Sequence, residues 1–317
     1  MKKLLVLLGL CAIAITLSAY LPSGRHLLTK VELGERLFFD SLLSRNNTVS
    51  CATCHKPEFA FADTLALTPG VYGRKAKRNT PSAMNLALQA TYFWDGRAKT
   101  LEQQALMPIE NPDEMDTPVD TVVARLNESA FYREAFMAVF NERATKESLA
   151  KALAAYQRTL ETNQSVFDEW RMWGDDEIVN AAVKRGFVIF NTKGKCVQCH
   201  FGADFNNPDF RNIGLFDGKS LNDSGRGAIT KKINDIGRFK IGPLRNIAIT
   251  APYMHNGMFK TLKEVINFYN DPSSVVPGSI NRDSLLLKPL GLSEQERSDL
   301  EEMLRSLTDK RFVKGGH

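Results

Sequence analysis

The sequence predicts a mainly α-helical protein built from two similar halves in tandem. Apolar residues recur at helical spacing along the chain, whereas the alternating pattern of a half-buried β-strand is scarce. A repeated pair of residues supports the division into halves: Gly34 and Phe38 in the first, and Gly186 and Phe190 in the second. The residues of each pair are four apart on a short apolar stretch, so they lie on one helix face. The two halves are therefore expected to be helical units of the same kind.

Two further helices are predicted from their apolar stripes. Leu149, Leu153 and Leu160 fall on one face of a helix that we expect to run from about Lys146 to Thr162. Near the end of the chain, the segment Ser293–Glu296 has a capping-box pattern, and an apolar stripe follows it. The sequence thus predicts a long helix towards the end of each half.

Each glycine–phenylalanine pair stands shortly before a Cys-x-x-Cys-His motif. The motifs are Cys51–His55 and Cys196–His200, with their second cysteines at Cys54 and Cys199. Two thiols at this spacing can add to the vinyl groups of a haem, and the adjacent histidine becomes an axial ligand of the iron. A zinc site and a redox-active cysteine pair are the alternatives. Only Cys11 lies outside the motifs, and both pairs run directly into a histidine, so the sequence predicts two covalently bound haem c groups with His55 and His200 as axial ligands.

The position of the helices relative to the motifs predicts the domain organisation. A short apolar helix just before the motif is the arrangement in which a small cytochrome c places its first helix beside the haem. We therefore expect two cytochrome-c-like haem domains in tandem, residues 30–165 and 176–312, with a junction near Gln164–Asp176. The polar, glycine-rich stretch Asn206–Gly237 is too long for a turn and is predicted to be a functional loop over the second haem.

Residues 1–19 have the pattern of a secretory signal peptide. Two lysines precede an apolar run that is too short for a membrane span, and small residues follow at Ser18 and Ala19. Cys11 leaves a lipoprotein open as an alternative, although Leu10 is too large for a good lipobox, and an uncleaved membrane anchor is another. Because c-type haem attachment takes place outside the bacterial cytoplasm, we expect a periplasmic protein.

Composition argues against a nucleic-acid partner. The formal net charge is +5, and haem propionates would cancel much of the excess. The sequence contains no charge run, no basic patch interleaved with aromatic residues and no glycine-rich phosphate loop. A homodimer is among the assemblies that the sequence allows.

The sixth ligands of the two irons distinguish an electron carrier from an enzyme. A carrier keeps both irons six-coordinate, whereas an enzyme leaves one iron open to substrate. Of the five histidines, His26 and His317 lie near the termini, so only His255 is left after the two motifs. The first half offers methionines instead, which we interpret as core or channel residues because Met commonly fills gaps. These residues are Met84, Met107, Met115 and Met137.

Longer motifs surround the two haem motifs. The first half contains, in order, Asn79-Thr80-Pro81, Phe93-Trp94-Asp95-Gly96-Arg97, Glu102-Gln103-Gln104, Pro108 and Glu114-Met115. The second half contains Asp223-Ser224-Gly225-Arg226, Phe239-Lys240, Leu244-Arg245-Asn246 and Ala251-Pro252-Tyr253-Met254-His255-Asn256-Gly257. From about Val31 to the last helix, the chain resembles the bacterial dihaem cytochrome c peroxidases and the related MauG enzymes.

This resemblance implies a division of labour between two haems near the domain interface. The first haem, on His55, would react with peroxide, with Glu114 as the distal carboxylate and Gln104 as the distal amide. A carboxylate above the iron can move protons between the peroxide oxygens once burial brings its pKa towards the working pH. Gln103 is an adjacent competitor for the amide role, and a solvated surface acid is the alternative interpretation of Glu114. Trp94 matches the tryptophan between the haems, although it is also interpretable as a core anchor.

The resemblance further implies a calcium ion between the domains. Asn79 would supply a side-chain oxygen, and Thr250 and Pro252 would supply backbone carbonyls, with water completing the shell. An all-oxygen ligand set suits a hard cation. Without the resemblance, none of the three residues would suggest calcium.

Two departures from the peroxidase pattern bear on function. Many of these peroxidases carry a capping histidine in a loop near the position of Val71, and the loop here has none, so we predict a first haem that is open without reductive activation. Tyr72 is an alternative cap. The peroxidases also place an axial methionine fourteen residues after the position of His255, where this chain has Tyr269, as MauG-type enzymes do. We therefore expect Tyr269 as a ligand of the second iron; the rival ligands are Met254 and Met258.

Together these interpretations predict a periplasmic dihaem peroxidase. It would reduce hydrogen peroxide to water with electrons from a small redox protein, a cytochrome c or a cupredoxin, or from another donor. A MauG-like oxidase that uses peroxide-derived oxidising equivalents on a protein or organic substrate is the first alternative. A non-enzymatic dihaem electron carrier is the second.

Overall fold

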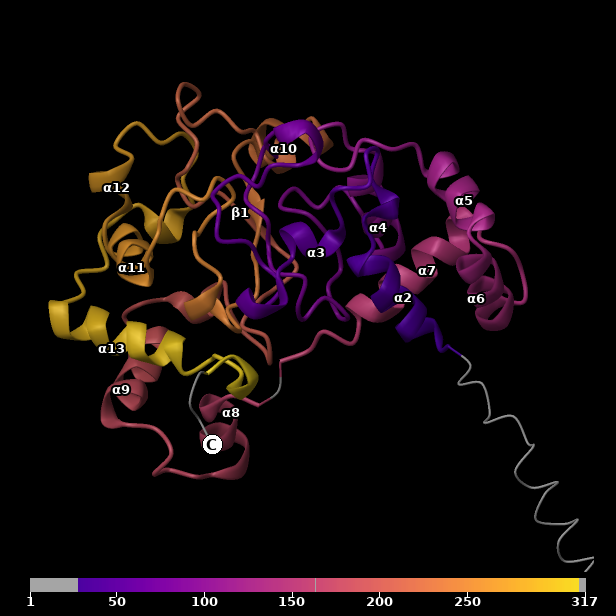
Figure 1. The fold of residues 1–317 in the computed structure, drawn as a ribbon. Coiled ribbons are helices and arrows are strands. Elements are labelled where there is room, and N and C mark those ends of the chain that lie inside the picture. The colour runs from indigo at the N-terminus through magenta and orange to yellow at the C-terminus, as the bar shows by residue number, and fades with distance from the viewer. Residues whose placement is uncertain (1–27, 163, 314–317) are drawn as a thin grey trace, which may run out of the picture.

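The computed structural model describes residues 28–162 and 164–313, and it is mainly helical with one small sheet (Figure 1). The predicted signal peptide, residues 1–19 with Cys11, lies outside the described residues, as do His26 and His317. Over these ranges, none of the helices combines the length and apolar character needed to cross a membrane.

The first half of the chain contains helices that pack on the right in Figure 1. These are α2 (Lys30–Phe39), α3 (Cys51–Cys54), α4 (Leu101–Glu110), α5 (Val119–Glu128), α6 (Ala130–Phe140) and α7 (Lys146–Gln157). Their apolar faces form one core that includes Leu33, Phe38 and Leu149, none of which is more than 1% exposed.

The second half contains further helices and the sheet, and most of its helices lie on the left in Figure 1. The helices are α8 (Val166–Trp173), α9 (Ala181–Asn191), α10 (Arg226–Thr230), α11 (Leu262–Asn270), α12 (Pro272–Val275) and α13 (Glu294–Arg305). The strands β1 (Phe210–Arg211) and β2 (Phe239–Lys240) pair antiparallel, with Phe210 opposite Lys240. A separate core surrounds Phe190, Phe268 and Met303.

A glycine at a helix crossing organises each half. Helix α2 crosses α7, and a Cβ on Gly34 would lie 1.9 Å from the carbonyl oxygen of Ala152. Helix α9 crosses α13 in the same manner, and a Cβ on Gly186 would lie 2.0 Å from the carbonyl oxygen of Asp299. Only glycine permits backbones to approach this closely. The repeated pairs lie on helices in both halves, as predicted, and the structure shows that they mark two equivalent helix crossings.

The structure extends the duplication to a second segment, 85–108, whose counterpart is 246–269. In each copy, the backbone N–H of an asparagine near the start of the segment donates to a carbonyl oxygen near the end of the same half. Asn85 N–H donates to Leu160 O at 2.8 Å, and Asn246 N–H donates to Leu307 O at 3.1 Å. A tyrosine hydroxyl then donates to a carbonyl six residues earlier, Tyr92 in one copy and Tyr253 in the other. The next helix begins in both copies after a threonine N-cap whose side chain accepts an N–H.

Some boundaries differ from the sequence prediction. The predicted helix from Lys146 to Thr162 ends at Gln157, because the chain turns there to bury Leu160 against the first core. The stretch Asn206–Gly237 is not a plain loop, since it contributes β1 and α10. Helix α8 occupies the predicted junction and packs on the second core through Phe167 and Trp170. The predicted capping box at the start of α13 is confirmed by reciprocal hydrogen bonds between Ser293 and Glu296.

Ionic and backbone contacts join the two halves around residues 91–97. Arg78 donates to both oxygens of Asp223, at 2.7 and 2.8 Å, and to Asp95 at 2.6 Å. From the second half, Arg226 donates to the backbone carbonyls of Asp95 and Gly96 in the first half, each at 2.9 Å.

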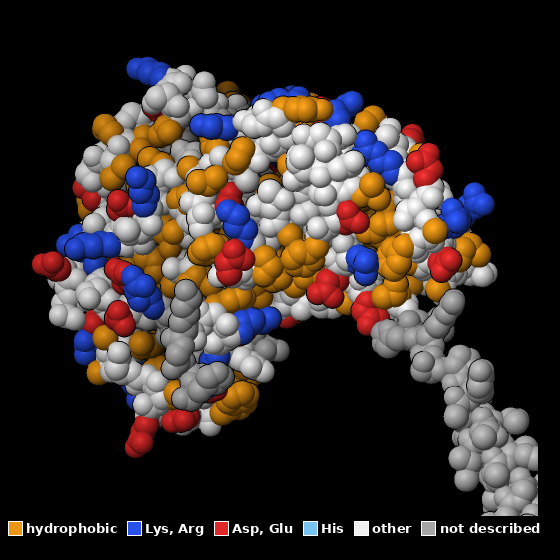
Figure 2. Space-filling view, in the orientation of Figure 1, with side chains coloured by type: hydrophobic (Ala, Val, Ile, Leu, Met, Phe, Trp, Pro, Cys, Tyr) orange, Lys and Arg blue, Asp and Glu red, His pale blue; other side chains and the backbone are white. Residues whose placement is uncertain are grey.

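On the face of the molecule shown in Figure 2, acidic and basic side chains are interspersed without a large patch of either sign.

The helix crossings generate the first testable prediction. Gly34→Ala and Gly186→Ala each place a methyl group much closer to a backbone carbonyl oxygen than the van der Waals contact distance. Each substitution is therefore expected to lower the free energy of unfolding by about 1–3 kcal/mol. Chemical denaturation of the haem-loaded protein measures this change. Gly278→Ala is the control, because a Cβ there meets no atom within 4 Å. Equal stabilities of all three variants would contradict the prediction.

Candidate active site

The first haem motif forms the short helix α3, which positions His55 at its end. Ser50 caps the helix, and His55 Nδ1 lies 2.9 Å from the carbonyl oxygen of Phe61. Because a carbonyl only accepts hydrogen bonds, Nδ1 carries the proton and Nε2 keeps a free lone pair. Burial lowers the pKa of His55, which keeps the ring neutral. A neutral, oriented imidazole of this kind is suited to bind iron.

The second motif repeats this arrangement in a 3₁₀ turn, Cys196–Gln198. His200 Nδ1 lies 2.8 Å from the carbonyl oxygen of Phe205, and burial lowers the pKa of this histidine as well. Both carbonyls come from residues with positive φ, 55° at Phe61 and 52° at Phe205. The same local backbone thus orients both histidines.

Each motif borders a cavity, and the two cavities share a wall. The first has a volume of about 780 Å³ and is lined by Cys54 and His55, and the second has about 240 Å³ and is lined by Cys196, Cys199 and His200. The shared wall places both cavities at the interface between the halves. It is made by residues that line both cavities, among them Trp94, Lys240, Gly242, Pro243, Tyr253 and Met254.

The side chains of the motifs fit covalent haem. All four motif cysteines are free thiols, and burial raises the pKa of Cys51 and of Cys196 to about 12, so these thiols are protonated before a cofactor is attached. Over residues 28–162 and 164–313, no three His, Cys, Asp or Glu side chains gather closely enough to hold a metal ion. The second motif instead offers two thiols and an imidazole to its cavity, and the first offers Cys54 and His55, with Cys51 on the same short helix.

A carboxylate and an amide line the first cavity together with His55. Glu114 Oε1 accepts a hydrogen bond from Asn111 Nδ2 at 2.6 Å, and burial raises the pKa of the carboxyl group. Gln104 also lines the cavity, and its buried Oε1 has no hydrogen-bond partner in the described chain. Gln103 is turned away, because its Oε1 accepts the N–H of Lys99 at 3.0 Å. The geometry therefore brings Gln104, and not Gln103, to the site of Glu114.

The loop at residues 70–74 packs against the turn that carries Glu114. Val71 N–H donates to the carbonyl oxygen of Glu114 at 2.8 Å, and a Cβ on Gly70 would lie 2.4 Å from that same oxygen. Arg74 adds a salt bridge to Asp116 at 2.7 Å. Val71 is completely buried, and Tyr72 is 64% exposed and lines neither cavity. The alternative in which Tyr72 caps the first haem has no support in this arrangement.

Trp94 lies in the wall between the cavities and is held at both ends. Its indole Nε1 donates to the carbonyl oxygen of Asn79 at 2.8 Å, and its own carbonyl accepts the N–H of Lys240 at 2.7 Å. The counterpart of Trp94 in the second half is His255, whose ring stacks on Phe239 with centroids 3.7 Å apart. Burial lowers the pKa of His255 to about 4, so its ring is neutral.

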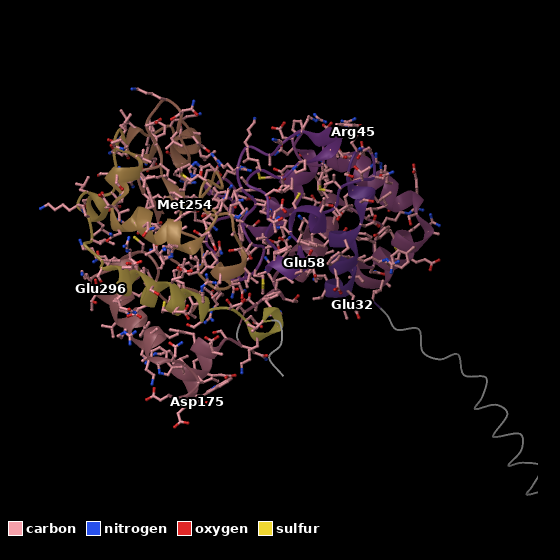
Figure 3. The ribbon with its side chains drawn as sticks, turned by 60° about the vertical axis from the view of Figure 1, so that its left-hand side comes forward. Glu32, Arg45, Glu58, Asp175, Met254 and Glu296 are labelled. Atoms are coloured by element: carbon pink, nitrogen blue, oxygen red, sulfur yellow. The ribbon has the colours of Figure 1, made fainter. Side chains whose placement is uncertain are left out.

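Tyr269 lines the second cavity with His200, on the same side of α11 as the buried residues Leu262 and Ile266. Burial raises the pKa of its phenol. Among the rivals, Met254 lines both cavities, whereas Met258 is 37% exposed and lines neither (Figure 3 labels Met254). The counterpart of Tyr269 in the first half is Pro108, whose side chain has no atom that could bind iron.

The residues proposed for calcium gather at the first cavity. Asn79 donates through Nδ2 to the carbonyls of Leu65 and Ala66, which leaves Oδ1 as a free acceptor. Thr250 and Pro252 line the same cavity, and no described N–H or O–H donates to their carbonyl oxygens. Three oxygens without hydrogen-bond donors are compatible with a hard cation.

The methionines of the first half differ in environment. Met84 is 1% exposed and lines the first cavity, and Met115 is buried in the core, as the interpretation of core or channel residues requires. Met107 and Met137 are instead exposed on the surface, which makes that interpretation wrong for these two. Sequence reasoning did not single out Asn111, although an asparagine that ends a helix three residues before a candidate acid was a usable signal.

Comparison with known proteins decides the family. Residues 28–177 match the family described as di-haem cytochrome c peroxidase. The chain is 40% identical to the methylamine utilization protein MauG of Methylorubrum extorquens, over 88% of this chain and 78% of that protein. It is 38% identical to the cytochrome c551 peroxidase of Pseudomonas aeruginosa, over 74% of this chain and 70% of that protein.

The chain belongs to the dihaem cytochrome c peroxidase family. Membership implies two c-type haems and a peroxidase or MauG-like activity. A crystal structure of a MauG-like protein associated with microbial copper homeostasis superposes with a TM-score of 0.81 at 32% identity, covering 90% of this chain and 93% of that one. The diheme peroxidase BthA of Burkholderia thailandensis shares the fold, with a TM-score of 0.78 at 24% identity, over 90% of this chain and 87% of that chain. These neighbours confirm the predicted fold class of two tandem cytochrome-c-like haem domains.

The geometry of this dihaem protein predicts the consequence of removing one motif. The double variant Cys51→Ser, Cys54→Ser is expected to keep a single covalent haem, because the second motif borders its own cavity. Denaturing mass spectrometry of the purified protein measures the number of haems. Wild-type protein serves as the control, and two covalent haems on the double variant would contradict the assignment.

Proposed function

We propose that the protein is a periplasmic dihaem peroxidase that reduces hydrogen peroxide to two waters with two electrons and two protons. The observation that carries this proposal is the pairing of Glu114 and Gln104 in the cavity of His55. A buried carboxylate with a raised pKa and an unpartnered amide beside an oriented imidazole are the groups that peroxide cleavage requires. The proposed domains are residues 30–165 for the reacting haem and 176–312 for the electron-transfer haem.

The residues of the first cavity would act as follows. Bound haem supplies an iron that accepts an oxygen ligand and changes its oxidation state. Glu114, as a carboxylate, takes the proton of the near peroxide oxygen and delivers it to the far oxygen, which leaves as water. Gln104 orients the peroxide through its free side-chain amide. His55, oriented by its hydrogen bond to the carbonyl oxygen of Phe61, would bind the iron.

The wall between the cavities supports a second role. Trp94, held by Asn79 and Lys240, is proposed to assist electron transfer between the two haems. Electrons would arrive at the haem of His200 from a cytochrome c or cupredoxin donor. We also propose a calcium ion on Asn79, Thr250 and Pro252 at the same interface. A homodimer is compatible with this scheme.

A second candidate function is MauG-like oxidation of a protein or organic substrate. Tyr269 in the second cavity and Val71 in place of a loop histidine favour it. A phenolate ligand stabilises ferric and higher oxidation states and lowers the potential, so the second haem would store oxidising equivalents. The electron-carrier alternative is disfavoured, because Pro108 stands in the first half where Tyr269 stands in the second. Comparing peroxide turnover with a reduced cytochrome and with an artificial donor separates the two enzymatic functions.

Glu114→Gln tests the acid–base role directly. The rate constant for the reaction with peroxide is expected to fall by about 10²–10⁴-fold, since the amide cannot accept the proton. In the wild type this rate constant should rise with pH through the pKa of Glu114, which burial raises, because the carboxylate is the active form. Stopped-flow measurement over pH provides both values. Glu110→Gln on α4 is the matched control, and full turnover by Glu114→Gln would remove the assignment.

The spin states of the as-isolated diferric protein test the ligands. One haem is expected to be high-spin, because no loop histidine caps the first iron, and electron paramagnetic resonance detects this state. Tyr269→Phe is expected to alter the signal of the second haem alone, whereas Met258→Leu leaves it unchanged. Two low-spin haems in the wild type would contradict the open site, and an unaltered second haem in Tyr269→Phe would exclude the tyrosine ligand.

A further inference from the structure

The turn that carries Glu114 is built around the polar groups of a single residue, Asn111. Its N–H donates to the carbonyl of Met107 at 3.1 Å, which ends helix α4. Its carbonyl accepts the N–H groups of Glu114 at 3.0 Å and of Asp116 at 2.9 Å. Its side chain makes two further hydrogen bonds: Oδ1 accepts the N–H of Asp113 at 3.0 Å, and Nδ2 donates to Glu114 Oε1 at 2.6 Å.

We propose that Asn111 is a positioning residue for the acid–base group: it holds one carboxylate oxygen of Glu114 and leaves the other for peroxide. This inference rests on the proposed function of Glu114. Oε1 is held by the amide, whereas Oε2 accepts no hydrogen bond from any described residue, and both Asn111 and Glu114 line the first cavity. The backbone of Glu114 is fixed independently by Val71 N–H at 2.8 Å. Glu114 is therefore held at its backbone carbonyl and at one carboxylate oxygen, and its other carboxylate oxygen is free of hydrogen bonds from the described residues.

The hydrogen bond from Asn111 also offsets the cost of burying the carboxylate. Burial raises the pKa of Glu114, and the amide donor opposes this rise because it favours the charged form. The other charges that act on Glu114 are Arg97, which lowers its pKa, and Asp113, which raises it. Asp113 is itself paired with Lys77 at 3.5 Å.

Further charges in the same turn are neutralised. Asp116 forms salt bridges with Arg45 at 3.0 Å and with Arg74 at 2.7 Å. The thiols of Cys51 and Cys54 are close enough to interact with Glu114, but they become uncharged thioethers once haem is attached. Asn111 thus supplies the one side-chain hydrogen bond from the described residues that favours the carboxylate of Glu114 over the carboxylic acid.

Two substitutions separate this role from a merely structural one. Asn111→Asp keeps the acceptor for Asp113 N–H, so the turn is preserved, but it replaces the donor with a second carboxylate facing Glu114. Asn111→Ala removes both hydrogen bonds of the side chain. If Asn111 acts on the carboxylate, the pKa of Glu114 rises more in Asn111→Asp than in Asn111→Ala. If Asn111 only shapes the turn, Asn111→Asp resembles the wild type and Asn111→Ala is the more damaged variant.

The experiment is a pH titration of the haem-loaded diferric protein. The acidic limb of the pH–rate profile for peroxide is expected to move up by about one pH unit in Asn111→Ala, and further in Asn111→Asp. Infrared difference spectra, in which the carboxyl band lost in Glu114→Gln identifies the group, follow the same protonation without turnover. Asn127→Ala is the matched control, because Asn127 makes two side-chain hydrogen bonds to Ala144 away from the cavity.

The possible failures are distinguishable. If the acidic limb of the pH–rate profile persists in Glu114→Gln, the proposed function itself is overturned. If the acidic limb disappears in Glu114→Gln but stays at its wild-type pH in Asn111→Asp, only the role of Asn111 is overturned. A larger pH shift of the limb in Asn111→Ala than in Asn111→Asp would also overturn the role of Asn111, because a purely structural residue gives that order.

Discussion

The hydrogen bond between a histidine Nδ1 and a backbone carbonyl underlies both halves of this molecule. At His55 and His200 this bond fixes the tautomer and the direction of Nε2, and everything else at either site is arranged relative to that nitrogen. The carbonyls are available because Phe61 and Phe205 adopt positive φ, which turns the chain back over the preceding motif. Without this turn, neither imidazole would be held in a fixed orientation at its cavity.

On this shared frame the two halves have diverged at a few equivalent positions. Trp94 corresponds to His255, and Pro108 corresponds to Tyr269, while the surrounding turns, tyrosine hydrogen bonds and threonine caps are retained. The first cavity therefore carries polar groups suited to proton transfer, and the second carries a phenol and an apolar lining suited to a closed redox centre. A single backbone design thus provides two chemically distinct environments.

The features that could be predicted from the sequence are those that depend on the spacing of residues close together in the chain. The haem motifs, the repeated glycine–phenylalanine pairs and the capping box before the last helix each depend on residues within about two helical turns of one another. The correspondence of residues 85–108 with 246–269 was missed, because its equivalent residues differ chemically and only the backbone preserves the pattern. Asn111 was missed for a related reason: its importance lies in how four polar groups are shared within a turn, which composition does not reveal. The end of α7 was misjudged because Leu160 continues the apolar spacing but reaches the core from a turn.

The contacts around residues 91–97 have a consequence for electron flow. A Cβ on Gly96 would lie 2.3 Å from the Phe210 ring; in the same segment, Asp95 accepts hydrogen bonds from Arg78 of the first half and from Arg226 of the second. Opening the interface would break several charged hydrogen bonds at once, which opposes a relative motion of the two halves. An interface held in this way would keep the distance between two bound haems nearly constant. Internal electron transfer would then be limited by driving force and reorganisation energy, and not by a domain motion.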